Sequence, residues 1–453
     1  MELKGLKTLV VGLARTGVAL ARFLAAAGAR VTVTDQAPAS ELSDSCQELK
    51  NFNIEKELGV PQPSRVTDYD LILLSPGVPP EVAWLQAARR VGIPIWGELE
   101  LASRFITLPV LAVSGTNGKT TTTTLVGEFL KESGFRPLVG GNIGTPVISL
   151  LPRQTEADFL VVEVSSFQLD TAPNFHPQAA ALLNISPDHL DRYPDYAAYV
   201  NSKAGLFRCQ TAKDLKVLNA DDPLVRSLNH GPSRVYRFST LGILPCGAWL
   251  ENDVIRVRLA SGQEEQFPLR DILLPGRHNQ ENIMAALLLT LDAGAEPAAC
   301  REVLARFRGL PHRLEWVARI GGVDFYDDSK GTNVVAVARS LAYFQRPVIL
   351  IAGGRNKDSD FTVLSPLIRE KVKALVLVGE TKEHLARVWG DCAPAYLAAD
   401  LAAAVARAWE IARPGDVVLL SPACASFDMF RDYAHRGETF QQLVREVQHA
   451  ADS

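Results

Sequence analysis

A glycine-rich turn between an apolar run and a Lys-Thr pair is the strongest chemical signal in the sequence. The run Val110–Val113 leads into Ser-Gly-Thr-Asn-Gly-Lys-Thr-Thr, which contains Gly115, Gly118 and Lys119. Glycines at these positions let backbone N–H groups close around phosphate oxygens, and the following helix directs its positive end at them. The lysine supplies charge for the terminal phosphates, and the Thr120 hydroxyl suits Mg²⁺. The predicted phosphate-binding residues are Gly115, Thr116, Asn117, Gly118, Lys119, Thr120 and Thr121.

This turn departs from the usual spacing at one position. The strict pattern Gly-x-x-x-x-Gly-Lys-[Ser/Thr] has a glycine where this chain has Val113. The alternative is an ordinary strand-to-helix turn, but the strand before it and the Lys-Thr pair after it favour phosphate binding. Glu163 ends the next predicted strand. Beside a phosphate loop, such an acid is better interpreted as a group that holds Mg²⁺ or its water shell than as a solvated strand end.

A second glycine turn, Gly12–Gly17, lies near the N-terminus between a predicted strand and a helix. Its sequence Gly-Leu-Ala-Arg-Thr-Gly has Ala14 where the dinucleotide fingerprint has its middle glycine, and Asp35 ends the next strand at the place of a ribose-binding acid. Three interpretations remain open: an NAD site, a helix N-terminus that binds another nucleotide diphosphate, and a tight turn without a ligand.

Polar clusters follow several later strands. The segment Asn184–Tyr193 contains His189, and the helix predicted over Tyr196–Phe207 carries Lys203 on a partly apolar side, where a lysine can also simply extend to solvent. Asn279 and Asn282 are three residues apart and share a helix face, where they could bind a base or cap the helix. The last third of the chain has four polar loops: Pro311–Arg313, Asp327–Asn333, Gly353–Lys357 and Ser421–Tyr433.

The composition is that of a soluble globular protein. The 453 residues are 47% hydrophobic and 22% charged with a net charge of −4, so disorder is excluded and a nucleic-acid partner is not expected. Six cysteines without CxxC spacing fit reduced thiols in a cytoplasmic protein better than zinc or disulfides. The N-terminus lacks a signal-peptide pattern, and no run of 18 apolar residues predicts a membrane span.

Alternation of strands and helices predicts an α/β protein built on parallel sheets. The expected domains are 1–97, 98–309 and 310–453. Two segments interrupt the alternation: Ala37–Ser64, interpreted as partly loop, and Val235–Glu265, interpreted as a small antiparallel insert.

Taken in chain order, the motifs resemble those of the Mur ligases, the ATP-dependent amide-forming enzymes of peptidoglycan precursor synthesis. The resemblance runs along nearly the whole chain through GTNGKT, Glu163, the NxSPDHLDR segment, Lys203, RHNxxN, PHR and DSKGTN. The GLARTG turn, the SPGVP turn, Gly140–Gly144 and the SPACASFDMF run point within that family to a member that adds D-glutamate to UDP-N-acetylmuramoyl-L-alanine.

The resemblance implies three domains: Rossmann-like at the N-terminus, a central P-loop ATPase-type domain with a mostly parallel sheet, and Rossmann-like at the C-terminus. It also implies ATP and Mg²⁺ as cofactors, an acyl-phosphate intermediate, and a cytoplasmic monomer. A folylpolyglutamate synthase-type ligase, another Mur ligase, an NAD-dependent oxidoreductase and a non-catalytic P-loop module are the alternatives.

The resemblance also assigns residues. Lys119, Lys203 and His189 would be catalytic, and Lys203 would carry a carbamate. Mg²⁺ would be held by Thr120, Glu163, His189 and Lys203. Contacts to ATP beyond the phosphate loop would come from Asn279, Asn282, Arg313 and Asp328. The UDP-sugar would be held by Arg15, Thr16, Asp35, Ser75 and Asn142, and glutamate by Lys330, Thr332, Lys357, Ser426 and Tyr433.

Overall fold

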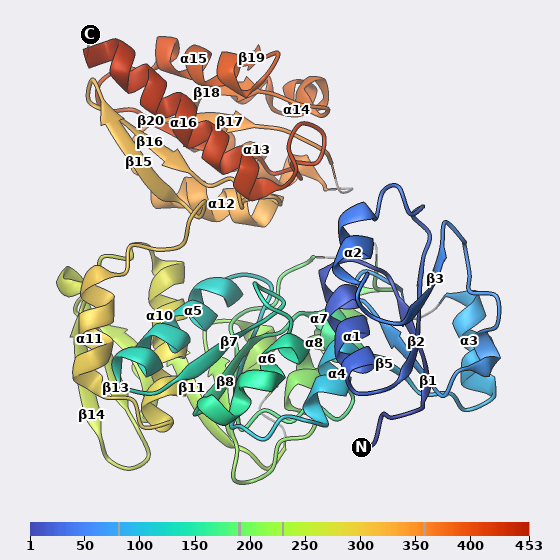
Figure 1. The fold of residues 1–453 in the computed structure, drawn as a ribbon. Coiled ribbons are helices and arrows are strands. Elements are labelled where there is room, and N and C mark those ends of the chain that lie inside the picture. The colour runs from blue at the N-terminus through green and yellow to red at the C-terminus, as the bar shows by residue number, and fades with distance from the viewer. Residues whose placement is uncertain (80–81, 189–191, 229–230, 357–358, 453) are drawn as a thin grey trace. The chain divides into compact units, whose positions relative to one another are not determined.

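The computed structural model describes residues 1–79, 82–188, 192–228, 231–356 and 359–452. Two compact units make up the chain, Met1–Arg306 and Phe307–Ser453, and each is described by itself. Three sheets, mostly parallel and covered by helices, confirm the α/β class (Figure 1). The domain limits predicted from the sequence stay a prediction.

The first sheet is entirely parallel, with the strand order β3-β2-β1-β4-β5. Its two faces have different partners because side chains alternate along a strand. Val10 of β1 is in the core with α1, whereas Leu9 and Val11 pack with Leu85 of α3. The elements are β1 (Lys7–Val11), α1 (Arg15–Ala26), β2 (Arg30–Asp35), α2 (Ser43–Glu48), β3 (Ile54–Leu58), η1 (Val66–Asp68), β4 (Leu71–Leu74), α3 (Ala83–Arg90), β5 (Ile95–Gly97) and α4 (Glu98–Ser103).

The segment 37–64 is more regular than its polarity suggests. It holds α2 and the edge strand β3, which pairs with β2 along its whole length. The remainder of the segment is turn and irregular backbone, so the interpretation as partly loop is confirmed, and β3 itself has no buried residue.

The second sheet has the strand order β14-β13-β12-β11-β10-β9-β6-β8-β7. Pairing is parallel from β7 through β12, and β12-β13-β14 is an antiparallel meander. The elements are β6 (Val110–Ser114), α5 (Lys119–Glu132), β7 (Pro137–Gly141), α6 (Val147–Leu150), η2 (Leu151–Glu156), β8 (Phe159–Glu163), α7 (Ser166–Asp170), β9 (Ala179–Leu182), α8 (Tyr196–Ala204), η3 (Gly205–Phe207), β10 (Leu215–Asn219), α9 (Pro223–Ser227), β11 (Arg234–Ser239), β12 (Gly247–Glu251), β13 (Val254–Arg258), β14 (Glu264–Pro268), η4 (Leu269–Asp271), α10 (Arg277–Asp292) and α11 (Pro297–Arg306).

The segment 235–265 is therefore not a separate antiparallel insert. β11 pairs in parallel with β10, and β12 pairs in parallel with β11. This segment therefore extends the same sheet that contains β6, the strand before the phosphate loop. Only its last two pairings are antiparallel. Short strands separated by turns look alike in sequence whichever direction they pair, which explains the error.

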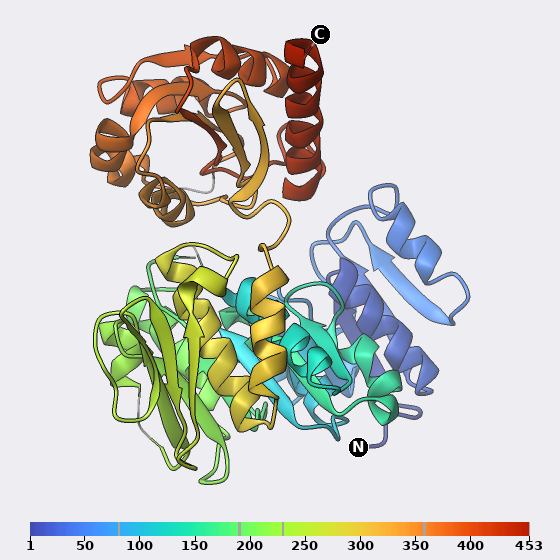
Figure 2. The same cartoon turned by 90° about the vertical axis from the view of Figure 1, so that its left-hand side faces the viewer.

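The second unit contains a six-stranded sheet with the order β15-β16-β20-β17-β18-β19. It is parallel except for the β15–β16 hairpin. Ile349 and Ile351 of β17 pack with α15 and α16, while Val348 and Leu350 pack with α12, α13 and α14, so helices cover both faces (Figure 2). The elements are β15 (Glu315–Ile320), β16 (Val323–Asp327), α12 (Val334–Tyr343), β17 (Val348–Ala352), η5 (Phe361–Leu364), α13 (Ser365–Lys371), β18 (Val372–Leu377), α14 (Lys382–Trp389), β19 (Ala395–Leu397), α15 (Leu401–Ile411), β20 (Val417–Leu420) and α16 (Tyr433–Asp452).

The helices were also compared with the length and hydropathy of a membrane-spanning helix. Within the described ranges, none combines the length and apolar character needed to cross a bilayer.

Candidate active site

The phosphate loop joins β6 to α5 and has two glycines with left-handed or near left-handed backbone. Gly115 has φ of 152° and Gly118 has φ of 85°. A Cβ on Gly118 would lie only 2.2 Å from the side-chain oxygen of Asn282, so no larger residue fits. Among the residues that the structure describes, no side chain caps α5. The positive end of the helix dipole therefore lies at the glycine loop, which favours an anion there.

Strand order places two further chain segments beside this loop. β6 lies between β8 and β9, with Val113 opposite Glu163 and Ser114 opposite Leu182. Because parallel strands end at the same sheet edge, the loop after β9 reaches the phosphate loop. The backbone N–H of Asn117 donates to the Asn184 side-chain oxygen at 2.9 Å, and the Asn184 amide donates back to the Asn117 carbonyl at 3.1 Å.

Glu163 has one paired and one unpaired carboxylate oxygen. Its side chain is buried, and its Oε1 accepts a hydrogen bond of 2.8 Å from the Asn142 amide. Within the described part of the chain, its Oε2 is also buried and has no hydrogen-bond partner. Buried carboxylate oxygens are normally hydrogen-bonded or bound to a cation. This unpaired oxygen fits the hard-oxygen coordination that Mg²⁺ prefers.

Lys203 and Lys119 converge on a single carbonyl of the phosphate loop. The Lys203 Nζ donates to the Gly115 oxygen at 2.9 Å, and the Lys119 Nζ donates to the same oxygen at 3.0 Å and to the Thr116 oxygen at 2.9 Å. Lys203 is only 2% exposed. Burial holds the pKa of its ammonium well below the usual range, and the Lys119 charge lowers it further. A lowered pKa favours the neutral form of the amine, which is the nucleophilic form.

Tyr199 belongs to this cluster, although the sequence alone did not single it out. Its hydroxyl lies 3.0 Å from the Thr116 hydroxyl, and its ring lies 4.8 Å from the Lys203 Nζ. Tyr199 and Lys203 are four residues apart on α8 and therefore share a face. That four-residue spacing was the only sign in the sequence that Tyr199 lies beside Lys203. It did not point to a functional residue, because an aromatic residue at helical spacing is usually part of a core.

Asn279 and Asn282 lie at the start of α10, which packs along α5. Asn282 is 3% exposed and approaches Gly118, and its amide donates to the Asn279 oxygen at 3.2 Å. The Asn279 amide donates to the Pro275 carbonyl at 2.7 Å. The structure thus places Asn282 against the phosphate loop, and Asn279 is hydrogen-bonded to Asn282.

The N-terminal glycine turn follows β1 at the point where the strand order reverses between β2 and β4. This is the crevice where open α/β sheets bind ligands. Asp35 accepts hydrogen bonds from the backbone N–H groups of Leu13 at 2.7 Å and Ala37 at 2.9 Å. The Ser75 hydroxyl donates to the Gly12 carbonyl at 2.7 Å. Both side chains therefore shape the crevice loops.

Arg15 and Thr16 open α1 beside this crevice. Arg15 is exposed, Thr16 is half-buried, and the Arg15 guanidinium donates to the Gly144 carbonyl at 2.7 Å. Gly144 belongs to the glycine-rich segment that also contains Asn142. The residues predicted to bind the UDP-sugar therefore lie beside two sheets. Most follow strands of the first sheet, and Asn142, which hydrogen-bonds to Glu163, follows β7 of the second.

Two site residues of the second unit lie near the end of β16. Asp328 is buried, and its Oδ2 accepts hydrogen bonds from the hydroxyls of Ser340 at 2.7 Å and Ser421 at 2.6 Å. Burial raises the pKa of this carboxyl to about 6. Arg313 is half-buried in the loop that precedes β15.

Of the predicted glutamate residues, Lys330, Thr332 and Ser426 lie in loops at the carboxyl edge of the same sheet, and Tyr433 begins α16. The Lys330 Nζ lies 3.6 Å from the ring centroid of Tyr433, the first residue of α16. Thr332 is half-buried, and Ser426 is buried in the loop after β20. His189 and Lys357 lie outside the described residues, so their predicted roles stay predictions.

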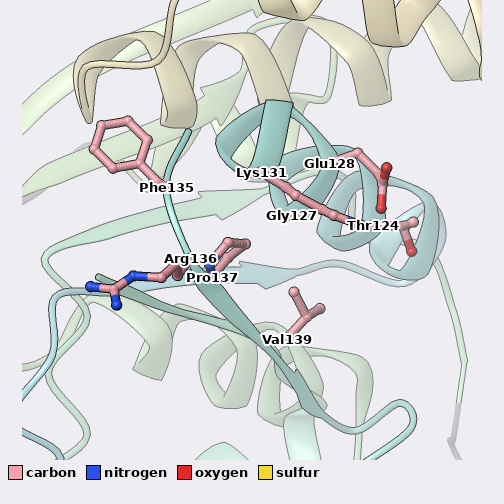
Figure 3. Close-up of a pocket in the computed structure, with 8 residues that line it drawn as sticks. All are labelled: Thr124, Gly127, Glu128, Lys131, Phe135, Arg136, Pro137 and Val139. Carbon is pink, nitrogen blue, oxygen red and sulfur yellow. The ribbon is translucent and has the colours of Figure 1, made fainter. Parts of the chain in front are cut away.

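A surface pocket of about 400 Å³ lies between α5 and β7 (Figure 3). Its described lining residues are Thr124, Gly127, Glu128, Lys131, Phe135, Arg136, Pro137 and Val139, and no predicted site residue is among them. Arg136 extends away from the helix and pairs with Asp158 at 3.0 Å. The pocket is therefore separate from the cluster around the phosphate loop.

Comparison with known protein families covers most of the chain. Residues 6–97 match the Mur ligase MurD-like, N-terminal domain, residues 113–290 match the Mur ligase middle domain, and residues 312–424 match the Mur ligase, glutamate ligase domain.

Curated relatives match over the full length. The UDP-N-acetylmuramoylalanine–D-glutamate ligase of Geotalea daltonii is 47% identical over 98% of both chains, and that of Geotalea uraniireducens is 47% identical over 100% of both. In fold, the chain is similar to a pseudomurein peptide ligase type C from Methanothermus fervidus, with a TM-score of 0.60, 19% identity and coverage of 98% of this chain and 100% of that one. UDP-N-acetylmuramate-alanine ligase MurC from Thermotoga maritima has a TM-score of 0.59, 19% identity and the same coverage. The chain belongs to the Mur ligase family.

Proposed function

We propose that this protein is an ATP-dependent ligase that joins D-glutamate to UDP-N-acetylmuramoyl-L-alanine in peptidoglycan precursor synthesis. Relatives with that name, 47% identical over at least 98% of this chain, support the substrates. The observation that carries the chemistry is the cluster of Lys119, Lys203 and Glu163 around the glycine loop. This cluster suits phosphoryl transfer and does not suit hydride transfer, which argues against the NAD-dependent alternative.

The proposed reaction has two steps. The terminal alanine carboxylate attacks the γ-phosphorus of ATP, the bond to the β-phosphate oxygen breaks, and ADP leaves. The glutamate amine, after losing a proton, then attacks the acyl carbon. The carbon–oxygen bond to phosphate breaks, and inorganic phosphate leaves as the amide forms. No enzyme nucleophile is required, so positioning and charge neutralisation provide the catalysis.

The phosphate loop would hold the ATP phosphates through its backbone N–H groups. Gly115, Thr116, Asn117, Gly118 and Thr121 shape that loop, and Lys119 would move its ammonium from the loop carbonyls to the β- and γ-phosphates. Asn279, Asn282, Arg313 and Asp328 are the further proposed ATP contacts.

Thr120, Glu163, His189 and a carbamate on Lys203 are the proposed Mg²⁺ ligands. The unpaired, buried Glu163 oxygen supports a cation here. Bound Mg²⁺ would neutralise charge on the transferred phosphoryl group. The low pKa of Lys203 supports the carbamate, because only the neutral amine adds to CO₂, with loss of one proton.

The substrate contacts are proposed on two sets of loops. Arg15, Thr16, Asp35, Ser75 and Asn142 would hold the UDP-sugar. The N-terminus of α1 supports this role, because its backbone N–H groups suit a diphosphate. Lys330, Thr332, Lys357, Ser426 and Tyr433 would hold glutamate, where the lysines would neutralise its carboxylates.

We further infer three domains, 1–97, 98–309 and 310–453, in a protein that works in the cytoplasm as a monomer. The absence of disulfides among the six cysteines supports a reducing compartment. Light scattering of the purified chain would test the monomer against a mass of 49.3 kDa.

Phosphate release from ATP across a grid of UDP-muramoyl precursors and amino acids tests the proposed function. We expect release only when UDP-N-acetylmuramoyl-L-alanine and D-glutamate are both present, with a matching amide product by mass spectrometry. L-Glutamate is the matched control and should not support release. Turnover with a different precursor or amino acid, but not with this pair, would contradict the proposal.

A further inference from the structure

The guanidinium of Arg436 lies buried beneath the loops of the second unit. Arg436 is in the first turn of α16 and is only 3% exposed. Its Nε donates to the Ser329 hydroxyl at 2.9 Å, and its Nη2 donates to the Ser329 carbonyl at 2.8 Å. Its Nη1 and Nη2 donate to the Cys424 carbonyl at 3.3 and 3.2 Å. One side chain thus joins two loops that are far apart in sequence.

These acceptors are all neutral, which makes Arg436 unusual. Across the described ranges, no carboxylate oxygen lies within ion-pair distance of it. Burial lowers its pKa to about 10, and the charges of Asp428, Asp327 and Asp328 only partly oppose that shift. A buried cation is costly unless its donors are satisfied. A planar guanidinium can satisfy several fixed acceptors together, whereas an ammonium presents a single point of charge. The site therefore selects for the shape of arginine.

The joined loops carry the residues proposed to bind glutamate. Ser329 immediately precedes Lys330, and Cys424 lies two residues before Ser426. A third loop, which follows β17 and contains Gly354, also lies close to Arg436. A Cβ built on Gly354 would be 3.3 Å from the Arg436 Nη1.

Backbone hydrogen bonds tie the three loops to one another. Arg355 and Ala425 exchange two bonds of 2.9 Å, and Ala423 donates to the Gly331 carbonyl at 2.9 Å. The loops after β16, β17 and β20 are therefore hydrogen-bonded to one another, and all three lie against Arg436.

A relay of two hydrogen bonds and one cation–π contact extends from Arg436 to Lys330. The Ser329 hydroxyl accepts from Arg436 and donates to the Tyr433 carbonyl at 2.8 Å. The Tyr433 ring then lies 3.6 Å from the Lys330 ammonium. The Tyr433 ring thus links the lysine to the first turn of α16, whose backbone is held by the Arg436–Ser329 pair.

We propose that Arg436 is a positioning residue for the amino-acid substrate, because it fixes the spacing between Lys330 and Ser426 without touching the substrate itself. This inference rests on the proposed function. It predicts that replacing Arg436 weakens glutamate binding selectively, while the sites for ATP and the UDP-sugar keep their affinity.

The test compares Arg436→Lys and Arg436→Gln with wild type in the phosphate-release assay. Both variants should raise the KM for D-glutamate by about tenfold or more, equivalent to about 1.4 kcal/mol, and should leave the KM for ATP and for the UDP-sugar within about twofold. Arg436→Lys keeps the charge, so its failure to restore the KM separates geometry from electrostatics. Arg445→Gln, an exposed arginine of the same helix, is the matched control and should behave as wild type.

Ser329→Ala provides the second variant if Arg436 variants do not fold, because it removes the middle of the relay and keeps the arginine. It should raise the KM for D-glutamate several-fold in a protein with native circular dichroism. An unchanged KM in all folded variants, or a wild-type KM in Arg436→Lys, would overturn the inference. Lack of wild-type turnover with D-glutamate would instead refute the proposed function.

Discussion

The Lys203 Nζ donates a hydrogen bond of 2.9 Å to the carbonyl oxygen of Gly115, which lies 88 positions earlier in the chain. This contact attaches α8 directly to the phosphate loop. Lys119 donates to the same oxygen, so two lysine side chains share one acceptor. If either lysine loses this hydrogen bond, its amino group can bind or react with another group at the loop.

Replacement of Lys203 by alanine should lower kcat by at least about 10³-fold, because a buried group that supplies charge to phosphoryl transfer is lost. Acetate should restore part of the activity by filling the place of the proposed carbamate. Potassium chloride at equal ionic strength controls for salt, and Lys213→Ala controls for loss of an exposed lysine. Full activity of Lys203→Ala without any additive would refute the assignment.

Lys119→Ala should abolish ATP-dependent turnover in a protein that remains folded, with a loss of about 10³-fold or more in kcat. The lost ammonium would otherwise neutralise the β- and γ-phosphates in a transition state with little covalent help. Lys131→Ala, on the exposed side of the same helix, is the control. Steady-state phosphate release and circular dichroism measure both effects, and near-normal turnover would exclude the phosphate-loop role.

Arg15→Ala should weaken binding of the UDP-sugar by about tenfold and leave ATP affinity nearly unchanged. The guanidinium is exposed at the N-terminus of α1 and reaches Gly144, away from the glycine loop of α5. Isothermal titration of each ligand separates the two affinities. Arg22→Ala, further along α1, should leave both unchanged. An equal loss of both affinities in Arg15→Ala would contradict separate sites.

Glu98 should make the stability of the first unit depend on pH. Its carboxyl is 2% exposed, it accepts a hydrogen bond of 2.6 Å from the Ile148 N–H, and burial raises its pKa from 4.5 to about 7. The folded state therefore binds more protons than the unfolded state between these values. The stabilisation is complete below about pH 4.5 and is lost as pH rises through about 7.

Glu98→Gln isolates this effect, because glutamine can accept the same hydrogen bond and does not titrate. The wild type should lose more stability than the variant between pH 5 and pH 8, with a difference of at most about 3 kcal/mol. Thermal unfolding followed by circular dichroism at both pH values measures the difference. Parallel behaviour of the two proteins would show that Glu98 does not titrate in this range.

Short stretches of the sequence were enough to predict the local features of the fold. The phosphate loop, the strand before it and the helix after it depend on glycine, lysine and apolar residues within a few positions of one another. The α/β class follows from alternating patterns of the same short range. Motif order along the chain was enough to identify the family, because it does not require knowledge of any contact.

Which side chains meet could not be predicted in this way, because it depends on how distant segments pack. Strand order brought Glu163 beside the phosphate loop and paired it with Asn142, and helix packing buried Lys203 next to Lys119. The role of Arg436 was equally hidden, since its acceptors lie in loops after β16 and β20. Such partners are set by contacts between distant segments, and burial then changes charge and pKa. Neither the partner nor the solvent exposure of a side chain is encoded by its near neighbours in sequence.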